Sequence, residues 1–424
     1  MKKKLLCIIL AALMLASLLP GVALAAEGEL VTSVSTEEDL RAFAASVNAG
    51  NDYAGVTVTL NNDIELTQPW TPIGISMEKP FKGTFNGNDH TISGLSLTVN
   101  EQTVEDGTEF GLFGRVDGGN IQSLTVTGNI NIVFQTGYQC PAARPEYVGG
   151  IAGQLMNGSI SDCAGYISIA AVNGGCIGGI VGEAYQATIS NTANYAKLNI
   201  SVTAHNDDYV GIDGATEDMA YANSGLRTFT VGGIAGYVVS GSTVDSCINY
   251  GSIKTNVPTS FVKDSKTGVV TFYDSQVGEV AGIAGSVSKS SFMNCANKGV
   301  IGDKVRYMAG ICNVMSASSK SNLINCYNSG SLSLLNKVRK PDQEVGETLG
   351  CLATWNPRQE YDKPNVSNCY NIGLMTYKTG ITYQTLGYDT TANPDDAAMI
   401  TTENLGEAYK ADDTGVNGGY PLLA

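Results

Sequence analysis

A short pattern of apolar residues and glycines recurs along this chain. Each copy places an apolar residue before one or two glycines, then an isoleucine, then a small or apolar residue. The clear copies occupy residues 148–153, 177–182, 231–236, 280–285 and 308–312, with a worn copy at 349–352 and an aromatic one at 110–114. The tightest repeats span 29 residues (151 to 180) and 28 residues (283 to 311). This period predicts stacked structural repeats rather than independent domains.

A second element follows each copy at a nearly fixed distance. A stretch rich in Ser, Asn and Asp ends in a cysteine or threonine, and in every copy but the first an asparagine stands two residues later. The row comprises Cys163, Thr192, Cys247, Cys295, Cys326 and Cys369, and the asparagines are Asn194, Asn249, Asn297, Asn328 and Asn371. In the compact copies the isoleucine and the row residue lie 12 or 13 positions apart. Each repeat therefore contains short β stretches separated by tight turns.

One repeat of this size cannot bury its own apolar side, whereas stacked repeats can. We predict an all-β chain that forms a right-handed parallel β-helix of roughly 9 to 11 coils from about Val56 to Gly373, with coils about 4.8 Å apart. The isoleucines should form an inner aliphatic row, and the cysteines should form a row of buried thiols. The asparagines should stand at turns, because Asn tolerates left-handed backbone angles and stacked amides can hydrogen-bond along the axis.

A helix is predicted before the first coil, over residues 36–48. Ser35 or Thr36 can cap its start, and the acidic residues 37–39 favour its positive end. Its apolar positions fall on one face, as the spacing of Leu40, Phe43, Ala44 and Val47 shows. We expect this helix to cover the open end of the stack and to block edge-to-edge pairing.

The first 25 residues have the order typical of a secretory signal peptide. Three lysines precede an apolar run from Leu5 to Leu19, and Ala23-Leu24-Ala25 offers a small-x-small cleavage site. A membrane anchor is the alternative, but the run is short and Pro20-Gly21 closes it. We therefore expect a secreted, cell-surface-associated protein that is not inserted in a membrane.

The repeat carries a family likeness. The Gly-Gly-Ile-Ala-Gly unit, followed by Ser-x-x-x-Cys-x-Asn-x-Gly, resembles the GLUG motif of bacterial surface proteins over about residues 110–373. Residues 35–95 are similar to the N-terminal cap and first coils of secreted bacterial β-helix proteins. The resemblance implies a β-helix protein of an adhesin-like kind. It divides the chain into a signal peptide (1–25), a cap with the first coils (26–110), GLUG-like repeats (111–373) and a closing segment (374–424).

Charge and residue usage exclude several classes of function. The net charge of −15 argues against nucleic acid and anionic membrane surfaces as partners. The chain has two histidines, His90 and His205, and lacks the His-Glu-x-x-His and Cys-x-x-Cys patterns of zinc sites. Cys140 and Cys176 lie off the cysteine row, which leaves a disulfide between them open. We expect a monomer without a resident cofactor.

An acidic loop offers one candidate metal site. Carboxylates at short spacing could hold calcium, which prefers hard oxygen ligands. The candidate ligands are Asp207, Asp208, Asp213 and Glu217. The alternative is a solvated loop on an acidic protein.

A second loop concentrates groups that sugar-binding sites use. Aromatic rings can cover sugar faces while carboxylates accept bonds from sugar hydroxyls. The residues are Trp355, Arg358, Glu360, Tyr361 and Asp362. The loop lengthens its repeat, since Cys351 stands 18 positions before Cys369 rather than 12 or 13. The alternative is that the aromatic residues pack on the terminal coil.

These observations favour a secreted or cell-surface binding or structural module, adhesin-like, with a glycan or a host or bacterial surface as its ligand. The alternative is a polysaccharide lyase or glycosidase on the same scaffold. Sparse, scattered basic residues argue against a lyase groove, so the sequence favours binding over catalysis.

Overall fold

The computed structural model describes residues 30–99, 109–133, 146–172, 175–202, 229–257, 259–263, 270–274, 278–314, 321–335, 348–355, 363–379 and 381–423. The predicted signal peptide, the loop with the four candidate calcium ligands, and positions 356–362 lie outside these residues. Within 259–263 and 270–274 only the backbone is described.

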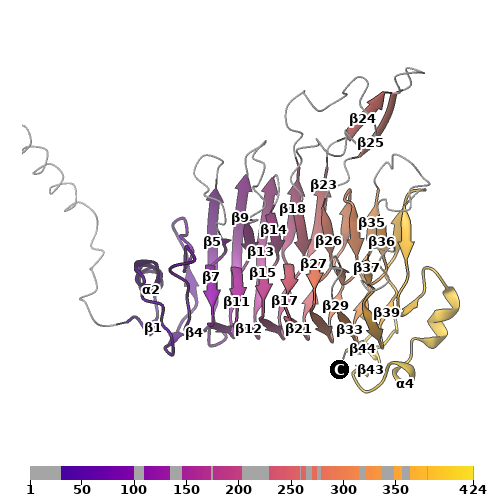
Figure 1. The fold of residues 1–424 in the computed structure, drawn as a ribbon. Coiled ribbons are helices and arrows are strands. Elements are labelled where there is room, and N and C mark those ends of the chain that lie inside the picture. Colours follow the sequence, from indigo (N-terminus) through magenta and orange to yellow (C-terminus); the bar gives the residue numbers. More distant parts are fainter. Residues whose placement is uncertain are drawn as a thin grey trace, which may run out of the picture.

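Four parallel sheets run side by side along one axis, as Figure 1 shows from the indigo to the yellow end. Sheet A contains β1 (Ser33–Val34), β2 (Thr57–Leu60), β4 (Thr84–Asn86), β8 (Asn120–Gln122), β12 (Ser159–Ser161), β16 (Thr188–Ser190), β21 (Thr243–Asp245), β28 (Ser291–Met293), β33 (Asn322–Ile324) and β38 (Asn365–Ser367). Sheet B contains β3 (Ile64–Glu65), β5 (Thr91–Val99), β9 (Thr125–Val133), β13 (Ala164–Val172), β17 (Ala193–Asn194), β18 (Lys197–Ser201), β22 (Ile248–Asn249), β23 (Ser252–Asn256), β29 (Ala296–Asn297), β30 (Ile301–Asp303), β34 (Tyr327–Asn328), β35 (Leu332–Leu334), β39 (Tyr370–Asn371), β40 (Met375–Tyr377) and β42 (Tyr388–Asp389).

The other two sheets lie on either side of the Gly-Gly-Ile motif. Sheet C contains β7 (Phe113–Asp117), β11 (Ala152–Met156), β15 (Val181–Tyr185), β20 (Ala235–Val239), β27 (Ala284–Ser288), β32 (Cys312–Val314) and β37 (Ala353–Trp355). Sheet D contains β6 (Glu109–Phe110), β10 (Tyr147–Gly149), β14 (Gly175–Gly178), β19 (Phe229–Gly232), β26 (Glu279–Ala281), β31 (Tyr307–Ala309), β36 (Thr348–Gly350) and β41 (Thr382–Gln384). Successive repeats pair strand for strand, so the chain is a parallel β-sheet repeat structure that fits a β-helix. The hairpin β24 (Thr259–Lys263) and β25 (Val270–Asp274) projects from the stack (Figure 1).

The predicted inner row of isoleucines is confirmed. All five side chains are fully buried: Ile151, Ile180, Ile234, Ile283 and Ile311. The backbone N–H of each of the first four donates to the carbonyl of the next, at 2.9–3.0 Å, so the row is continuous along the axis. Close packing explains a glycine beside this row, because a Cβ on Gly282 would lie 2.2 Å from the carbonyl oxygen of Gly310.

The cysteine row is also buried, and its thiols are free. Each thiol donates to the carbonyl two residues earlier, as in the 3.1 Å contact from Cys295 Sγ to the oxygen of Met293. The residue before each row position has a positive φ of 48–55°, and Asn294 is one example. These left-handed residues make a sharp corner between sheets A and B, which explains why Asn, Asp and Ser occupy them.

Titration of the thiols tests this burial. We expect native protein to react slowly with a thiol reagent, because burial raises the pKa of Cys295, Cys326 and Cys369 well above the ordinary value. Denatured, unreduced protein should yield at least five free thiols. A yield of one or none would show that disulfides link the row.

A buried amide ladder runs beside the thiols. Asn194, Asn249, Asn297 and Asn328 each donate from Nδ2 to Oδ1 of the next asparagine at 2.7–2.8 Å, and Asn371 ends the series by donating to Asp389. The same side chains bind backbone groups of the residue two positions later, which is Ala196 after Asn194 and a glycine, such as Gly299, after the others. Each amide thus fixes its own turn and joins neighbouring coils.

Helix α2 (Glu37–Ala49) lies at the indigo end of the stack (Figure 1). Thr36 and Asp39 form a capping box at its start, and Gly50 ends it in a left-handed conformation. Its buried residues are those expected from the sequence, and Phe43 packs between aromatic rings of the first coils, such as Phe85 at 5.8 Å. A helix therefore forms within one residue of the predicted range 36–48, and the predicted apolar face is buried.

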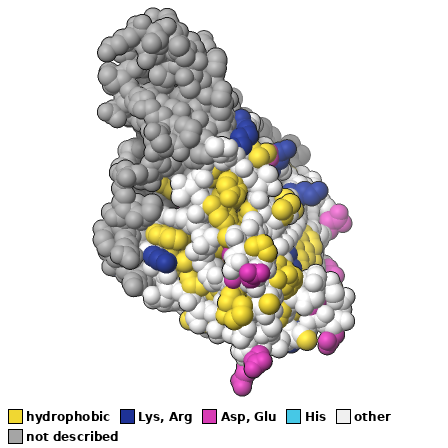
Figure 2. Space-filling view, turned by 90° about the vertical axis from the view of Figure 1, so that its right-hand side faces the viewer, with side chains coloured by type: hydrophobic (Ala, Val, Ile, Leu, Met, Phe, Trp, Pro, Cys, Tyr) yellow, Lys and Arg dark blue, Asp and Glu magenta, His cyan; other side chains and the backbone are white. Residues whose placement is uncertain are grey.

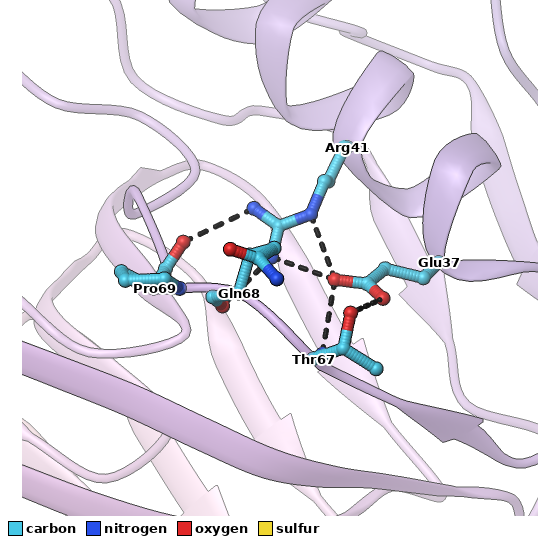
Figure 3. A network of polar contacts seen from close by, with 5 residues as sticks. All are labelled: Glu37, Arg41, Thr67, Gln68 and Pro69. Atoms are coloured by element: carbon cyan, nitrogen blue, oxygen red, sulfur yellow. Dashed lines mark hydrogen bonds and ion pairs between the residues drawn. The ribbon is translucent and has the colours of Figure 1, made fainter. Parts of the chain in front are cut away.

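Polar contacts fix the outer side of this helix (Figure 3). Glu37 pairs with Arg41 at 2.7 Å and accepts bonds from the backbone and hydroxyl of Thr67. Arg41 also donates to the carbonyls of Gln68 and Pro69. This network joins helix α2 to the loop that enters the second coil. Glu37 and Arg41 therefore have a structural role.

At the other end, the closing segment folds back over sheet B. It contains the 3₁₀ helix Pro394–Met399, the short helix α4 (Thr402–Leu405), and the strand pair β43 (Tyr409–Lys410) and β44 (Leu422–Leu423). Ile400, Leu405 and Tyr409 pack on the outward side chains of Tyr327 and Tyr370. Figure 2 looks onto this end, where apolar side chains gather toward the middle and several acidic ones lie along the right and lower rims.

Candidate functional site

The structure describes one of the five residues predicted to contact sugar. Trp355 ends β37 and is partly buried against the core. Its backbone is held by the side-chain amide of Gln384, which donates to its carbonyl and accepts from its N–H, both at 3.0 Å. The ammonium of Lys363 lies 5.6 Å from the centre of its ring. Arg358, Glu360, Tyr361 and Asp362 lie outside the described residues, as do the acidic loop residues proposed for calcium.

A column of tyrosines stands on the outer face of sheet B. Tyr166, Tyr195 and Tyr250 occupy the same position in three consecutive coils and are 40–47% exposed. Their rings stack in parallel, with centroids 4.5 Å and 4.9 Å apart and planes within 4°. Stacking covers the faces that the three rings turn toward one another and leaves the ring edges and hydroxyls open to solvent. The three residues form what we call the tyrosine column.

Lys298 occupies the next position of this column. Its ammonium lies 5.5 Å from the centre of the Tyr250 ring and 5.8 Å from that of Tyr327. Burial lowers the pKa of Lys298, while Asp412 in the closing segment acts in the opposite direction. Beyond Lys298, Tyr327 stacks on Tyr370 at 5.0 Å beneath the closing segment. The exposed column therefore ends where that segment begins.

The outer face of sheet B differs in charge from the rest of the chain. Acidic residues are absent from every described strand of this sheet except β3, β30 and β42, although the chain has 40 Asp and Glu against 25 Lys and Arg. Lys197 and Lys254 are exposed on β18 and β23, and within the described residues neither is ion-paired. The remaining outward positions are mostly Ser, Thr and Asn, such as Asn129 and Asn199. We call this surface the sheet B face.

The junction of sheets C and D holds a second group of polar side chains. Arg115 pairs with Glu109 at 3.3 Å and also binds Gln154, which binds Glu183 in the next coil. Farther along the junction, Ser286 donates to Glu279. We call this row the polar seam.

Burial perturbs the acids of the polar seam. It raises the pKa of Glu183, against the opposing effects of Gln154, Tyr147 and Arg115. Burial also raises the pKa of Glu279 to about 7, against the opposing effects of Ser286 and Arg306. Shifted carboxyl pKa values are a common property of catalytic acids. Glu183 is only 7% exposed, however, and Gln154 is equally covered, so a polymer has no direct access to this part of the seam.

The arrangement of His, Cys, Asp and Glu side chains in the described part of the chain bears on metal binding. No group of three or more His, Cys, Asp or Glu side chains there is arranged to hold a metal ion. His90 contacts Asp63 at 3.3 Å, and Asp63 also accepts the backbone N–H of Thr91, which lowers the pKa of that carboxyl. This pair joins the first two coils, in agreement with a structural role for His90. Nor does any described helix have the length and apolar character needed to cross a membrane.

Sequence reasoning did not find the tyrosine column. A signal was present, because Tyr195 and Tyr250 both follow the ladder asparagine directly, and Tyr166 holds the same place one repeat earlier. In the repeat motif that position is only the variable residue of Asn-x-Gly. Its outward orientation depends on the alternation of the strand, which the repeat register defines.

Comparisons with known proteins extend only to the fold. No family model matches the chain, and no curated protein matches it. One similar solved structure is described as "Crystal structure of a putative immunoglobulin A1 protease from Bacteroides ovatus"; it has a TM-score of 0.50 and 15% sequence identity, over 92% of this chain and 91% of that one. Another, "IgA1 Protease", has a TM-score of 0.47 and 13% identity, over 82% of this chain but 22% of that one. Fold and surface together define the class, a parallel β-sheet repeat protein with an open, acid-poor sheet face.

Proposed function

We propose that this chain is a secreted, cell-surface binding module, adhesin-like, that holds a glycan of a host or bacterial surface on the sheet B face. The tyrosine column carries the proposal, because Tyr166, Tyr195 and Tyr250 form an exposed aromatic stripe that the core does not need. The right-handed winding, the capping role of helix α2, the likeness to GLUG-motif proteins and a monomeric state belong to the same proposal.

Export is supported by the predicted signal peptide at residues 1–25. The first of the two similar structures supports the fold alone, and the protease activity in its name is stated for that protein. The parallel β-sheet stack is compatible with an extracellular protein, since its free surface is long and regular.

The surface chemistry suits hydroxyl-rich ligands. Phenol hydroxyls of the tyrosine column recur about every 4.8 Å along the axis, as neighbouring strands do. Amide and hydroxyl groups surround them, for example Asn199 and Ser168. An extended sugar chain along the axis would meet donors and acceptors at regular intervals, while ring edges contact its apolar C–H groups.

Replacing Tyr166, Tyr195 and Tyr250 together by alanine should abolish glycan binding. Each side chain is at least 40% exposed, so the melting temperature should fall by only a few degrees. A glycan array followed by titration calorimetry on the best ligand measures the loss. Tyr377→Ala is the matched control, because Tyr377 is 43% exposed and stacks on Tyr383 away from the column. Unchanged binding in the folded triple variant would contradict the proposal.

The loop that contains Trp355 is a second proposed contact, together with Arg358, Glu360, Tyr361 and Asp362. We expect Trp355→Ala with Tyr361→Ala to weaken binding at an unchanged melting temperature if the loop is a site. The partly buried position of Trp355 favours the competing structural role. A large fall in melting temperature, or binding that survives in a folded variant, would leave the loop as a cover over the terminal coil.

For the enzymatic alternative, a lyase or glycosidase, the carboxyl groups with raised pKa values among the described residues are the acids of the polar seam. Release of reducing sugar from polysaccharides bound in the array tests it, with Glu183→Gln and Glu279→Gln as the diagnostic variants. We propose no resident cofactor. The exception that we propose to test is calcium bound by Asp207, Asp208, Asp213 and Glu217. The test compares the melting temperature of the protein with added calcium and with a chelator.

A further inference from the structure

We propose that the sheet B face selects anionic glycans, that is, polysaccharides whose sugar units carry carboxylates, over neutral ones. This inference rests on the proposed function and adds the chemical class of its ligand. The reason is a contrast in charge, because the face is basic while the chain as a whole carries a net charge of −15.

The lysines of the face lie on three consecutive coils, at different positions along their strands. Lys197 pairs in register with Ser252, two positions before Lys254 on the neighbouring strand. Lys298 stands one coil farther along, at the end of the column. Neighbouring strands lie about 4.8 Å apart, and Lys197 and Lys254 differ by two strand positions, so their long side chains can reach the same ligand. An extended polyanion that crosses the face beside these two lysines would meet both ammonium groups.

Among the described residues, two acidic side chains lie near these lysines, Asp303 and Asp412. Lys197 and Lys254 have no carboxylate partner among the described residues. Asp303 lies at the end of β30, beside Thr255 in register. Asp412 opposes the lowering of the Lys298 pKa, and so partly neutralises the charge of this lysine. We therefore assign the charge selectivity chiefly to Lys197 and Lys254.

The tyrosine column makes the ligand a glycan rather than any polyanion. Stacked rings offer their phenol hydroxyls, which can exchange hydrogen bonds with sugar hydroxyl groups. Flat bases would need free ring faces for stacking. In this structure the faces between the three rings are covered by neighbouring tyrosines at 4.5 Å and 4.9 Å, and Lys298 lies over the far face of Tyr250. Within the column, only the outer face of Tyr166 is therefore left for a base to stack on.

The test compares matched polymers. Polygalacturonate and its fully methyl-esterified form share one sugar backbone and differ in charge; a single-stranded DNA oligonucleotide serves as the non-sugar polyanion. We expect polygalacturonate to bind at least tenfold more tightly than its ester, and its affinity to fall as NaCl is raised from 50 to 500 mM. The Lys197→Gln/Lys254→Gln variant should lose the preference and the salt dependence, yet keep binding of neutral array ligands. Lys79→Gln/Lys410→Gln, which removes lysines outside the face, should change neither.

The outcomes separate the two proposals. Equal binding of the acid and the ester would overturn the charge selectivity and leave glycan binding intact. Equal binding of DNA and polygalacturonate would overturn the glycan assignment. Absence of binding to every array glycan, with a native melting temperature, would overturn the proposed function itself. A preference for the acid that survives in the folded lysine variant would place the selectivity elsewhere.

Discussion

Replacing Asn297 by alanine is expected to lower the free energy of unfolding by about 3 kcal/mol or more. Its amide is fully buried and makes four hydrogen bonds, two to the backbone of Gly299 and one each to Asn249 and Asn328. Alanine removes all four and leaves the facing amide groups of both neighbours without their partner. A buried amide group that loses its hydrogen-bond partners destabilises the folded state more than an exposed one does. The loss in free energy of unfolding should therefore exceed that of an ordinary polar-to-alanine change.

Urea unfolding followed by circular dichroism measures this loss. Asn365→Ala is the matched control, because Asn365 donates to Asn322 in the same manner, at 2.9 Å, but lies exposed on sheet A. Its removal should cost less than about 1 kcal/mol. Similar losses in the two variants would show that the inner amide ladder has no special role.

Glu279→Gln is expected to stabilise the protein at pH 8 and to have little effect at pH 5. Burial raises the pKa of Glu279 to about 7 from its ordinary value of 4.5, and its Oε2 is buried without a hydrogen-bond partner. The protonated form is therefore favoured in the folded state. Its contribution to stability is fully present below about pH 4.5 and is lost as pH rises through about 7, by at most about 3 kcal/mol.

Thermal melts at half-unit steps from pH 5 to pH 8 test this dependence. The difference in melting temperature between the variant and the parent protein should grow with pH, because glutamine does not titrate. Glu65→Gln, on the exposed edge of β3, controls for a general change in net charge and should give a pH-independent difference. A flat difference for Glu279→Gln would mean that this carboxyl is ionised in the folded protein throughout the range.

The sequence alone was sufficient to predict a stack of parallel β-sheet repeats. The recurrence of Gly-Gly-Ile and of Cys-x-Asn gave the register of the stack, and the structure confirms the buried isoleucines, the buried thiols and the linked amides. These features were predictable because one residue type repeated at one position must occupy one environment in a stack. The helix before the first coil was equally predictable, because capping and apolar spacing are local properties of the sequence.

The sequence could not show which outward positions form a surface. Tyr166, Tyr195 and Tyr250 are separated by 29 and 55 positions and meet only because 29 and 55 residues each complete one coil. The same holds for the polar seam, where Glu183 and Gln154 appear along the chain as ordinary exposed polar residues but are buried by the approach of sheets C and D.

The sequence by itself determined the repeat, because each copy carries side chains of the same size and residues with the same turn preference. Only the tertiary structure decided which outward side chains stack and remain exposed to solvent. A loop of any length can separate two coils without changing their pairing, so spacing along the chain does not report which side chains stack. The fold placed Lys298 between Tyr250 and Tyr327 and covered Tyr370 with the closing segment. Long-range packing, rather than local sequence, therefore set the limits of the open face.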